Sequence, residues 1–167
     1  MAARHEYTYA PAPLQYAVLS AFHRDKDELH MYIVHTRKIL AAVARYCHRA
    51  LVDVGCLVHP ADGGYYLMPE FQTLVGKFAS SQELANRLLS DASVAVMPTH
   101  PMFSRSPEEL TVRLCFVNFD GAKALAASLR LGSQANLDDA FVETNCQETV
   151  DGVKRLVDFV KQLQEDD

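Results

Sequence analysis

Residues 110–116, which read LTVRLCF, are the stretch that decides the fold. Apolar side chains alternate along it, so Val112 and Leu114 are predicted to point to one face of a strand, and Arg113 and Cys115 to the other. The pattern extends this strand over 110–119. The apolar stretches 65–68 and 94–97 are predicted to be strands of the same sheet, and 57–59 is predicted to be a short strand that turns back into 65–68 through 60–64. We therefore expect a small mixed or antiparallel sheet of three to five strands around one arginine.

Helices are expected to lead into this sheet or to cover it. Between Leu29 and Val54, apolar residues recur at spacings of three, four and seven, which predicts one long helix over about 27–54 that ends at Gly55. Shorter helices are predicted at 14–22, 82–91, 121–131 and 148–164, with Ser80 or Ser81 capping the second of them, and 132–147 is predicted to be a loop. The expected fold class is α+β, with a long N-terminal helix.

Composition and charge disfavour several classes of function. The chain has 167 residues and a net charge of −5, and its basic residues form no long block, which disfavours a nucleic-acid surface. No apolar run has the length needed to span a bilayer, and the first residues lack the apolar core of a signal peptide. Four scattered cysteines are typical of reduced thiols. We expect a cytoplasmic protein with neither nucleic acid nor membrane as a partner.

Arg113 is the first candidate for a functional residue. A guanidinium stays charged, and an unpaired buried charge is costly, so Arg113 must reach water, an acidic side chain or an anionic ligand. Its planar fork matches a carboxylate through two parallel hydrogen bonds. A structural ion pair at the rim of the sheet is the alternative, and the strand pattern alone favours neither.

The turn before Tyr65 is the second candidate. Gly63 and Gly64 allow a positive φ or the close approach of a ligand, and Tyr65 or Tyr66 would place an aromatic face beside it. Taken alone, an ordinary hairpin with one core tyrosine is the better interpretation.

Metal and nucleophile motifs are weak. Cys47-His48 and Cys56-x-x-His59 hold ligand residue types, but zinc sites normally need two well-spaced pairs, and adjacent residues of a helix diverge. Neither a G-x-S-x-G elbow nor a phosphate loop is present. The residues themselves therefore predict a binding element, no metal and no catalytic residue.

Several segments together resemble a known family. Residues 10–17 (APAPLQYA), the long helix, 63–71 (GGYYLMPEF), 94–98 (VAVMP) and 112–116 (VRLCF) follow one another in that order. Over 7–164 the chain resembles the C-terminal part of a class I/II aminotransferase, a pyridoxal-phosphate enzyme of fold type I. No single motif is decisive; their order and spacing carry the resemblance.

The resemblance implies a domain organisation and a substrate site. Residues 1–25 would be a remaining segment of the large domain, 26–55 the helix that links the domains, and 56–167 the small domain. The family's strand arginine binds the α-carboxylate of the amino-acid substrate, so Arg113 is implied as a substrate-binding residue. Gly64 and Tyr65 are implied more weakly as substrate-binding residues.

Two departures limit the resemblance. The loop at 99–103 reads THPMF, where the family usually has small residues, so its substrate contacts are doubtful. The family's cofactor lysine lies in a large domain that would precede Met1, and no lysine here has a matching context; the residues that bind the cofactor are therefore unknown. The resemblance implies pyridoxal 5′-phosphate, an amino acid and a 2-oxo acid in the complete enzyme, and no cofactor on this chain alone.

Three hypotheses follow. The chain is a C-terminal piece of an aminotransferase, inactive alone, whose partner is the missing large domain or a second copy. It is instead a non-catalytic module that binds a small carboxylate or a partner peptide. Or it is a structural partner domain, whose apolar surface on 14–22 and 27–54 favours self-association.

Overall fold

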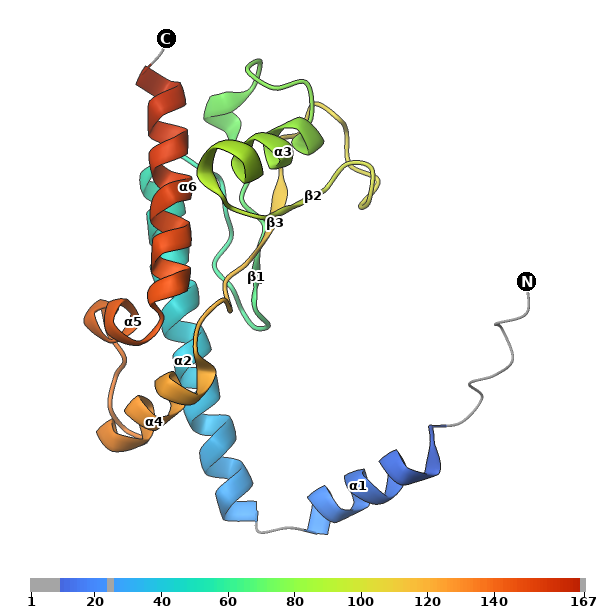
Figure 1. Ribbon diagram of the computed structural model, residues 1–167, viewed down its shortest axis with the longest axis vertical. Helices are drawn as coiled ribbons and strands as arrows, with labels where there is room; N and C mark the ends of the chain where they lie inside the picture. Colours follow the sequence, from blue (N-terminus) through green and yellow to red (C-terminus); the bar gives the residue numbers. More distant parts are fainter. Residues whose placement is uncertain (1–9, 24–25, 166–167) are drawn as a thin grey trace. The chain divides into compact units, whose positions relative to one another are not determined.

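The computed structural model describes residues 10–23 and 26–165. Its helices and strands confirm the expected α+β class, with a three-stranded antiparallel sheet in the order β1-β3-β2 (Figure 1). In chain order the elements are α1 (Ala12–His23), α2 (Lys26–Asp53), β1 (Tyr66–Leu67), the 3-10 helix η1 (Gln72–Leu74), α3 (Ser81–Ala92), β2 (Met97–Pro98), β3 (Val112–Cys115), α4 (Gly121–Leu131), α5 (Asp139–Asn145) and α6 (Gln147–Glu165).

The chain divides into two compact units, one up to Val34 and one from His35 onward. The first unit holds α1 and the beginning of α2. No described residue of α1 is buried, and its large apolar side chains are exposed. Leu29 and Ile33, at the start of the apolar stripe of α2, are exposed as well.

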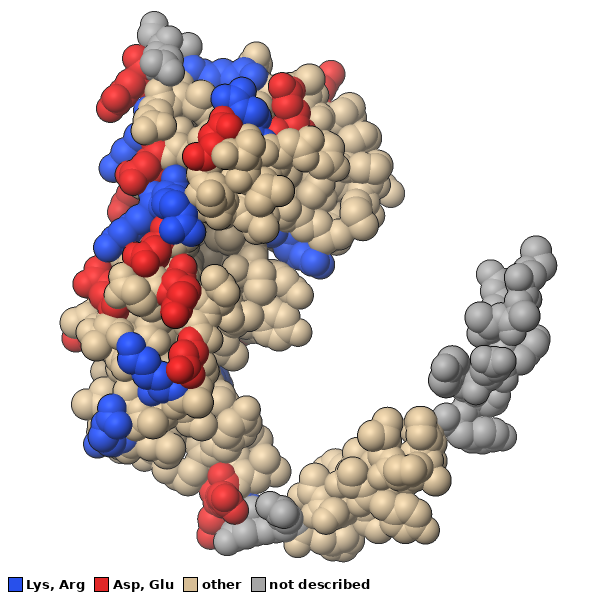
Figure 2. Space-filling view, in the orientation of Figure 1, with Lys and Arg blue, Asp and Glu red and all other residues tan. Residues whose placement is uncertain are grey.

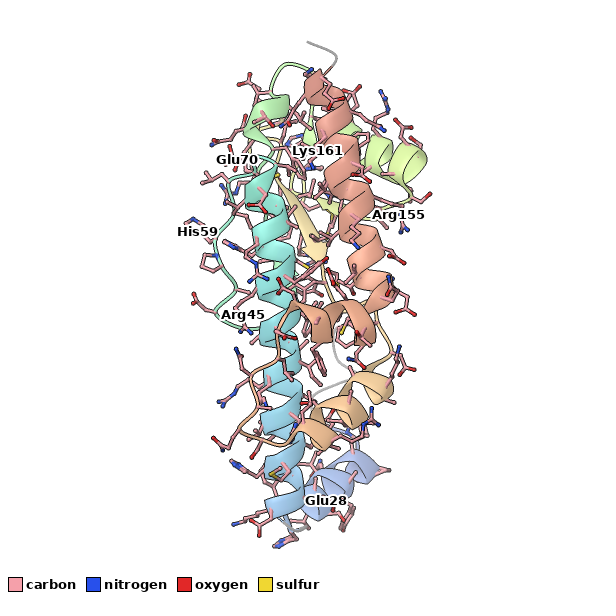
Figure 3. All side chains as sticks on the ribbon, turned by 90° about the vertical axis from the view of Figure 1, so that its left-hand side faces the viewer. Glu28, Arg45, His59, Glu70, Arg155 and Lys161 are labelled. Atoms are coloured by element: carbon pink, nitrogen blue, oxygen red, sulfur yellow. The ribbon has the colours of Figure 1, made fainter. Side chains whose placement is uncertain are left out.

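The core of the second unit lies between the helices and the sheet. From α2 it takes Ile39, Val43, Cys47 and Leu51, which are all buried. The predicted stripe, which ran through Leu40, is confirmed at the last three of these, whereas Leu40 is half-buried and Ile39 is buried in its place. From α6 it takes Val150, Val153, Leu156, Phe159 and Val160. Figures 1 and 3 show α2 and α6 side by side, with the sheet packed against the pair. Gly55 ends α2 with a φ of +83°, a conformation that suits glycine.

Strand β3 is the centre of the sheet. Tyr66 and Leu67 of β1 pair with Cys115 and Leu114 on one side, while Met97 of β2 pairs with Arg113 on the other. The predicted alternation is confirmed, because the inward side chains are all buried: Leu110, Val112, Leu114 and Phe116.

All four strand predictions were too long, and the one at 65–68 is regular only over Tyr66–Leu67. Residues 57–59 contribute a single bridge, from Leu57 to Glu70, and the strand predicted at 110–119 is regular only from Val112 to Cys115. The strand predicted at 94–97 begins only at Met97, and Ala95 is exposed. Val58 and Val94 of these segments are buried, as their apolar character predicts, but pairing depends on where the partner backbones converge.

The predicted loop at 132–147 contains a helix that sequence reasoning missed. The side chain of Asp138 accepts a hydrogen bond of 2.9 Å from the main-chain N–H of Phe141, which caps α5. Phe141 and Val142 are buried against the core. The helix has only 7 residues, too few for a 3.6-residue periodicity to stand out.

A buried histidine, also missed, joins α2 to α4. His35 is fully buried, and its Nδ1 lies 2.7 Å from Oγ of Ser128. Its Nε2 has no hydrogen-bond partner among the described residues. One turn further along α2, the amine of Lys38 donates to the carbonyl oxygens of Gly132 and Ser133, each at 2.9 Å, and so holds the end of α4.

No helix in the described part of the chain combines the length and the apolar character needed to cross a bilayer.

Cysteine chemistry gives a first test of this core. Burial raises the pKa of Cys47 and Cys56 from about 9 to about 12, and that of Cys146 to about 11, whereas Cys115 is exposed. We expect one thiol, Cys115, to react quickly with a thiol reagent at pH 8 in the native state, and all four after unfolding in urea. Fast reaction of a second native thiol would contradict this core.

The same thiols set a pH dependence. Their folded pKa values lie above the unfolded value of about 9, so the unfolded state loses protons first as the pH rises. The contribution of these thiols to the free energy of unfolding should be constant below about pH 8 and should fall from pH 9 towards pH 12. Cys56→Ala should reduce the slope, measured by urea unfolding at successive pH values.

Gly152 gives a further test. It lies inside α6, and a Cβ added there would meet no atom within 4 Å. Because glycine costs a helix interior about 0.5–1 kcal/mol relative to alanine, Gly152→Ala should raise the free energy of unfolding by about that amount. Urea unfolding measures the change. A decrease would mean that the position is crowded.

Candidate carboxylate site

Arg113 lies on the outer face of the sheet, above an aromatic ring. Its guanidinium carbon is 4.4 Å from the centroid of the Tyr66 ring. Tyr66 pairs with Cys115, two residues along β3 from Arg113, so both side chains leave the same face of the sheet. The buried alternation of β3 therefore places the cation and the ring together.

The charge of Arg113 has no acidic partner within residues 10–23 and 26–165. Among the described residues, no carboxylate lies within ion-pair distance of its guanidinium, which is half-buried. A cation–π contact of this kind contributes about 0.5–2 kcal/mol, depending on desolvation, and it uses the face of the ring rather than the N–H donors. The N–H donors of the Arg113 fork are not used by this contact, and their planar geometry matches a carboxylate.

The tyrosine that contacts Arg113 is Tyr66. The residues alone left Tyr65 and Tyr66 open, and the resemblance implied Tyr65, which lies against Tyr66 with ring centroids 4.8 Å apart and planes tilted by 58°. The period-two register of β1 against β3 separates the two tyrosines, and it is known only once the pairing of these strands is known.

Gly64 shapes the turn before these rings. Its φ is +71°, and a Cβ there would meet no atom within 4 Å, so the backbone conformation and not crowding favours glycine. The structure places Gly64 in the exposed bend that precedes β1, one residue before Tyr65.

The loop after β2 borders the sheet but carries little charge. Arg105 is paired with Glu109 at 2.9 Å, and Thr99 donates a hydrogen bond of 2.8 Å to the carbonyl oxygen of Thr111, which ties the loop to β3. Met102 and Phe103 are exposed. Figure 2 shows that charged side chains gather along α6, whereas the visible surface of this loop region is mostly uncharged.

No lysine of the described chain has an amine that is shown to contact Arg113 or Tyr66. Those of Lys38, Lys77 and Lys123 donate to main-chain carbonyl oxygens. Lys154 and Lys161 line a shallow pocket between α2 and α6, and Figure 3 shows Lys161 on that side of α6. Lys26 is exposed at the start of α2, in the first unit. Since pyridoxal phosphate needs a lysine amine beside the substrate carboxylate, the described residues do not fit a site for it.

Metal binding has no structural support within residues 10–23 and 26–165. No group of three histidine, cysteine, aspartate or glutamate side chains is arranged there to hold an ion.

Comparisons with known proteins agree with this architecture. The family model described as aminotransferase class I and II matches residues 1–129. Among solved structures, the aromatic aminotransferase from Pyrococcus horikoshii superposes with a TM-score of 0.62 at 17% identity, and the match covers 90% of this chain and 31% of that chain. At this identity the likeness shows the fold alone, and this chain spans less than a third of that enzyme. No curated protein matches the chain.

A double-mutant cycle tests the pairing of Arg113 with Tyr66. Arg113→Gln and Tyr66→Leu, singly and together, should give a coupling free energy of about 0.5–1 kcal/mol in urea unfolding, because each change removes the same cation–π contact. Tyr66→Phe should keep most of the coupling. A coupling energy of zero would show that the contact has no energetic weight.

Proposed function

The chain belongs to the class I and II aminotransferase family, and we propose that it forms the C-terminal, small-domain part of a pyridoxal-phosphate-dependent aminotransferase. In this proposal residues 1–25 belong with the large domain, 26–55 link the two domains and 56–167 form the small domain. The reaction of the whole enzyme is the transfer of an amino group between an amino acid and a 2-oxo acid.

The observation that carries the proposal is the environment of the Arg113 side chain. Arg113 is a half-buried cation stacked on Tyr66, without an acidic partner among the described residues. We propose that Arg113 binds the α-carboxylate of the substrate through two parallel hydrogen bonds. Tyr66 supports the guanidinium from below and limits its rotation, and Tyr65 and Gly64 form the edge of the site.

This chain contributes binding and orientation rather than bond-breaking. In the family, pyridoxal phosphate supplies the amino-group chemistry, and the described lysines here do not fit it. We therefore expect no transamination by this chain alone. Its partner would be a large domain or a second copy, and the exposed apolar side chains of α1, such as Leu14, Tyr16 and Phe22, suit such a contact.

A second candidate function is a non-catalytic module that binds a small carboxylate. The amines of Lys38, Lys77 and Lys123 donate hydrogen bonds to main-chain carbonyl groups. This favours the second function, because binding of a carboxylate by Arg113 needs none of these amines, whereas transamination needs a lysine amine. Both functions share Arg113, and they differ in whether an amino group is transferred.

Titration with pyruvate and with alanine tests the shared site. Binding followed by NMR shifts of β3 should weaken at least about tenfold in Arg113→Ala, because a hydrogen bond to a charged group contributes about 1.5–3 kcal/mol. Arg113→Lys should be intermediate, since it keeps the charge and loses the fork. Arg130→Ala, an exposed arginine of α4, is the matched control and should bind as the unaltered chain does.

A second measurement separates the two candidate functions. The chain is incubated with pyridoxal phosphate, reduced with borohydride and mapped for a modified lysine. No specific modification, together with carboxylate binding, is the expected result. Stoichiometric modification of one lysine would contradict the assignment of the cofactor to another part of the enzyme. Unchanged pyruvate binding in Arg113→Ala would overturn both functions.

A further inference from the structure

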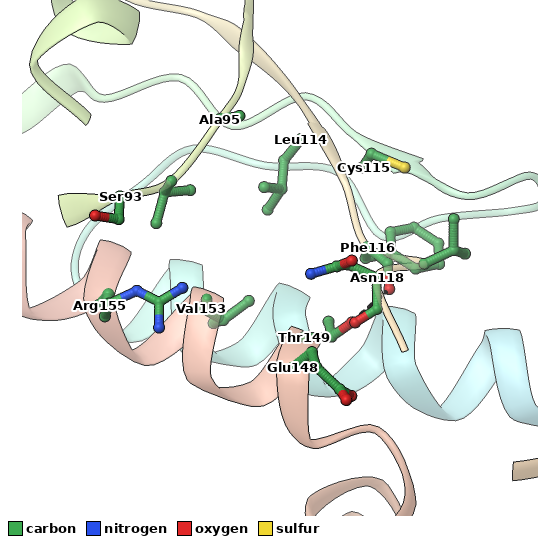
Figure 4. Close-up of a pocket in the computed structure, with 13 residues that line it drawn as sticks. Ser93, Ala95, Leu114, Cys115, Phe116, Asn118, Glu148, Thr149, Val153 and Arg155 are labelled. Carbon is green, nitrogen blue, oxygen red and sulfur yellow. Dashed lines mark hydrogen bonds between the residues drawn. The ribbon is translucent and has the colours of Figure 1, made fainter. Parts of the chain in front are cut away.

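A groove lies between α6 and the far end of the sheet, and Arg113 does not line it. It has a volume of about 460 Å³, within the usual range for ligand pockets. Its floor is apolar and buried, formed by Val94, Leu114, Phe116 and Val153. Figure 4 shows Glu148 and Arg155 on the α6 side, with Ser93 and Ala95 across from them.

The groove exists because the β2–β3 ladder stops early. Met97 pairs with Arg113, and continuing the same register would pair Ala95 with Cys115. Instead, no hydrogen bond joins the main chains of Ala95 and Cys115 among the described residues, and both residues line the groove. On the other side of β3, the N–H of Phe116 donates to Tyr65 at 3.2 Å, so by alternation the main-chain groups of Cys115 face the groove.

The two ends of the groove carry opposite charges. Nε of Arg155 donates to the carbonyl oxygen of Ala92 at 3.1 Å, which fixes the guanidinium, while its terminal nitrogens have no partner among the described residues. Glu148 is seven residues earlier on the same helix, which is about 10 Å along its axis. Its carboxylate likewise has no hydrogen bond or ion pair within the described part of the chain.

Gly152 keeps the middle of the groove open. It lines the groove between Glu148 and Arg155, and a Cβ there would enter empty space. Neither a positive φ nor a close neighbour calls for glycine at this position in the helix. The sequence therefore keeps an unfavourable helix residue at a place where a side chain would fill the groove.

We propose that this groove binds a short extended peptide with free ends, of about three residues. Its carboxylate contacts the terminal nitrogens of Arg155, and its ammonium contacts Glu148. Three extended residues span about 10 Å, which matches the rise of α6 between Glu148 and Arg155. The amides of the peptide bind the free main-chain groups of Ala95 and Cys115, as an added strand does.

The length and charge requirements of the groove are tested with trialanine. Binding is followed by NMR shifts of Gly152 and Cys115 in the full chain. Trialanine should bind, while N-acetyl-trialanine and trialanine amide should each bind at least about tenfold more weakly, because each lacks one charged end. Alanine alone should also bind more weakly here, since it cannot reach both charges. Equal binding of all four compounds would overturn the proposal.

Substitutions then assign the two ends. Glu148→Gln should abolish the preference for a free amino end and keep the preference for a free carboxyl end. Arg155→Gln should do the reverse. Lys154→Gln is the matched control for the loss of one positive charge on α6, because Lys154 lines a different pocket. It should leave both preferences unchanged. Loss of both preferences in Lys154→Gln would mean that only the general charge of the helix matters.

Gly152 separates binding from stability. Gly152→Leu should weaken trialanine binding at least about tenfold, and Gly152→Ala should weaken it less while raising the unfolding midpoint. Arg113→Ala should leave trialanine binding intact, so failure here is distinguishable from failure of the proposed substrate site. Full binding by folded Gly152→Leu would overturn the proposal, and so would loss of binding in Arg113→Ala.

Discussion

The alternation of β3 is the constraint on which both the fold and the candidate site depend. Leu110, Val112, Leu114 and Phe116 are buried on its inner face, and each such side chain contributes about 1.5–3 kcal/mol relative to exposure. A shift of the register by one residue would exchange these side chains with Arg113 and Cys115, so a charge would enter the core. Arg113 therefore faces outward because its neighbours must face inward.

Much of this arrangement could be predicted from the sequence, because long periodic patterns leave few alternatives. The stripe of α2 and the alternation around Arg113 are such patterns, and the resemblance placed them in one family. The predictions failed in segments where the local sequence pattern is weak, or where the position of other segments decides which secondary structure forms. Helix α5 was too short to show a period, and the stretch 94–97 has the composition of a strand without a partner along most of its length.

Arg113, the cation of the candidate site, could be predicted from the sequence, but the residues around it could not. Arg113 stood out because a charge in an apolar strand requires an explanation. Tyr66 did not stand out from Tyr65, because only the pairing of β1 with β3 decides which ring lies under the guanidinium. The groove beside α6 was out of reach for the same reason, since its walls come from 93–95, 114–118 and 148–155. Gly152 was the one local signal, a glycine inside a helix without a turn to explain it.

The early end of the β2–β3 ladder gives the two sites different character, although one strand serves both. At Arg113 the ladder is intact, so the backbone is satisfied and recognition rests on a single oriented fork. Two residues further, at Cys115, the main-chain donor and acceptor face an open groove and make no hydrogen bond to Ala95 among the described residues. Exchanging water for a ligand amide gains only about 0.5–1.5 kcal/mol per hydrogen bond. Selectivity in the groove must therefore come from its charged ends, Glu148 and Arg155, whose spacing along α6 is fixed by the helix itself.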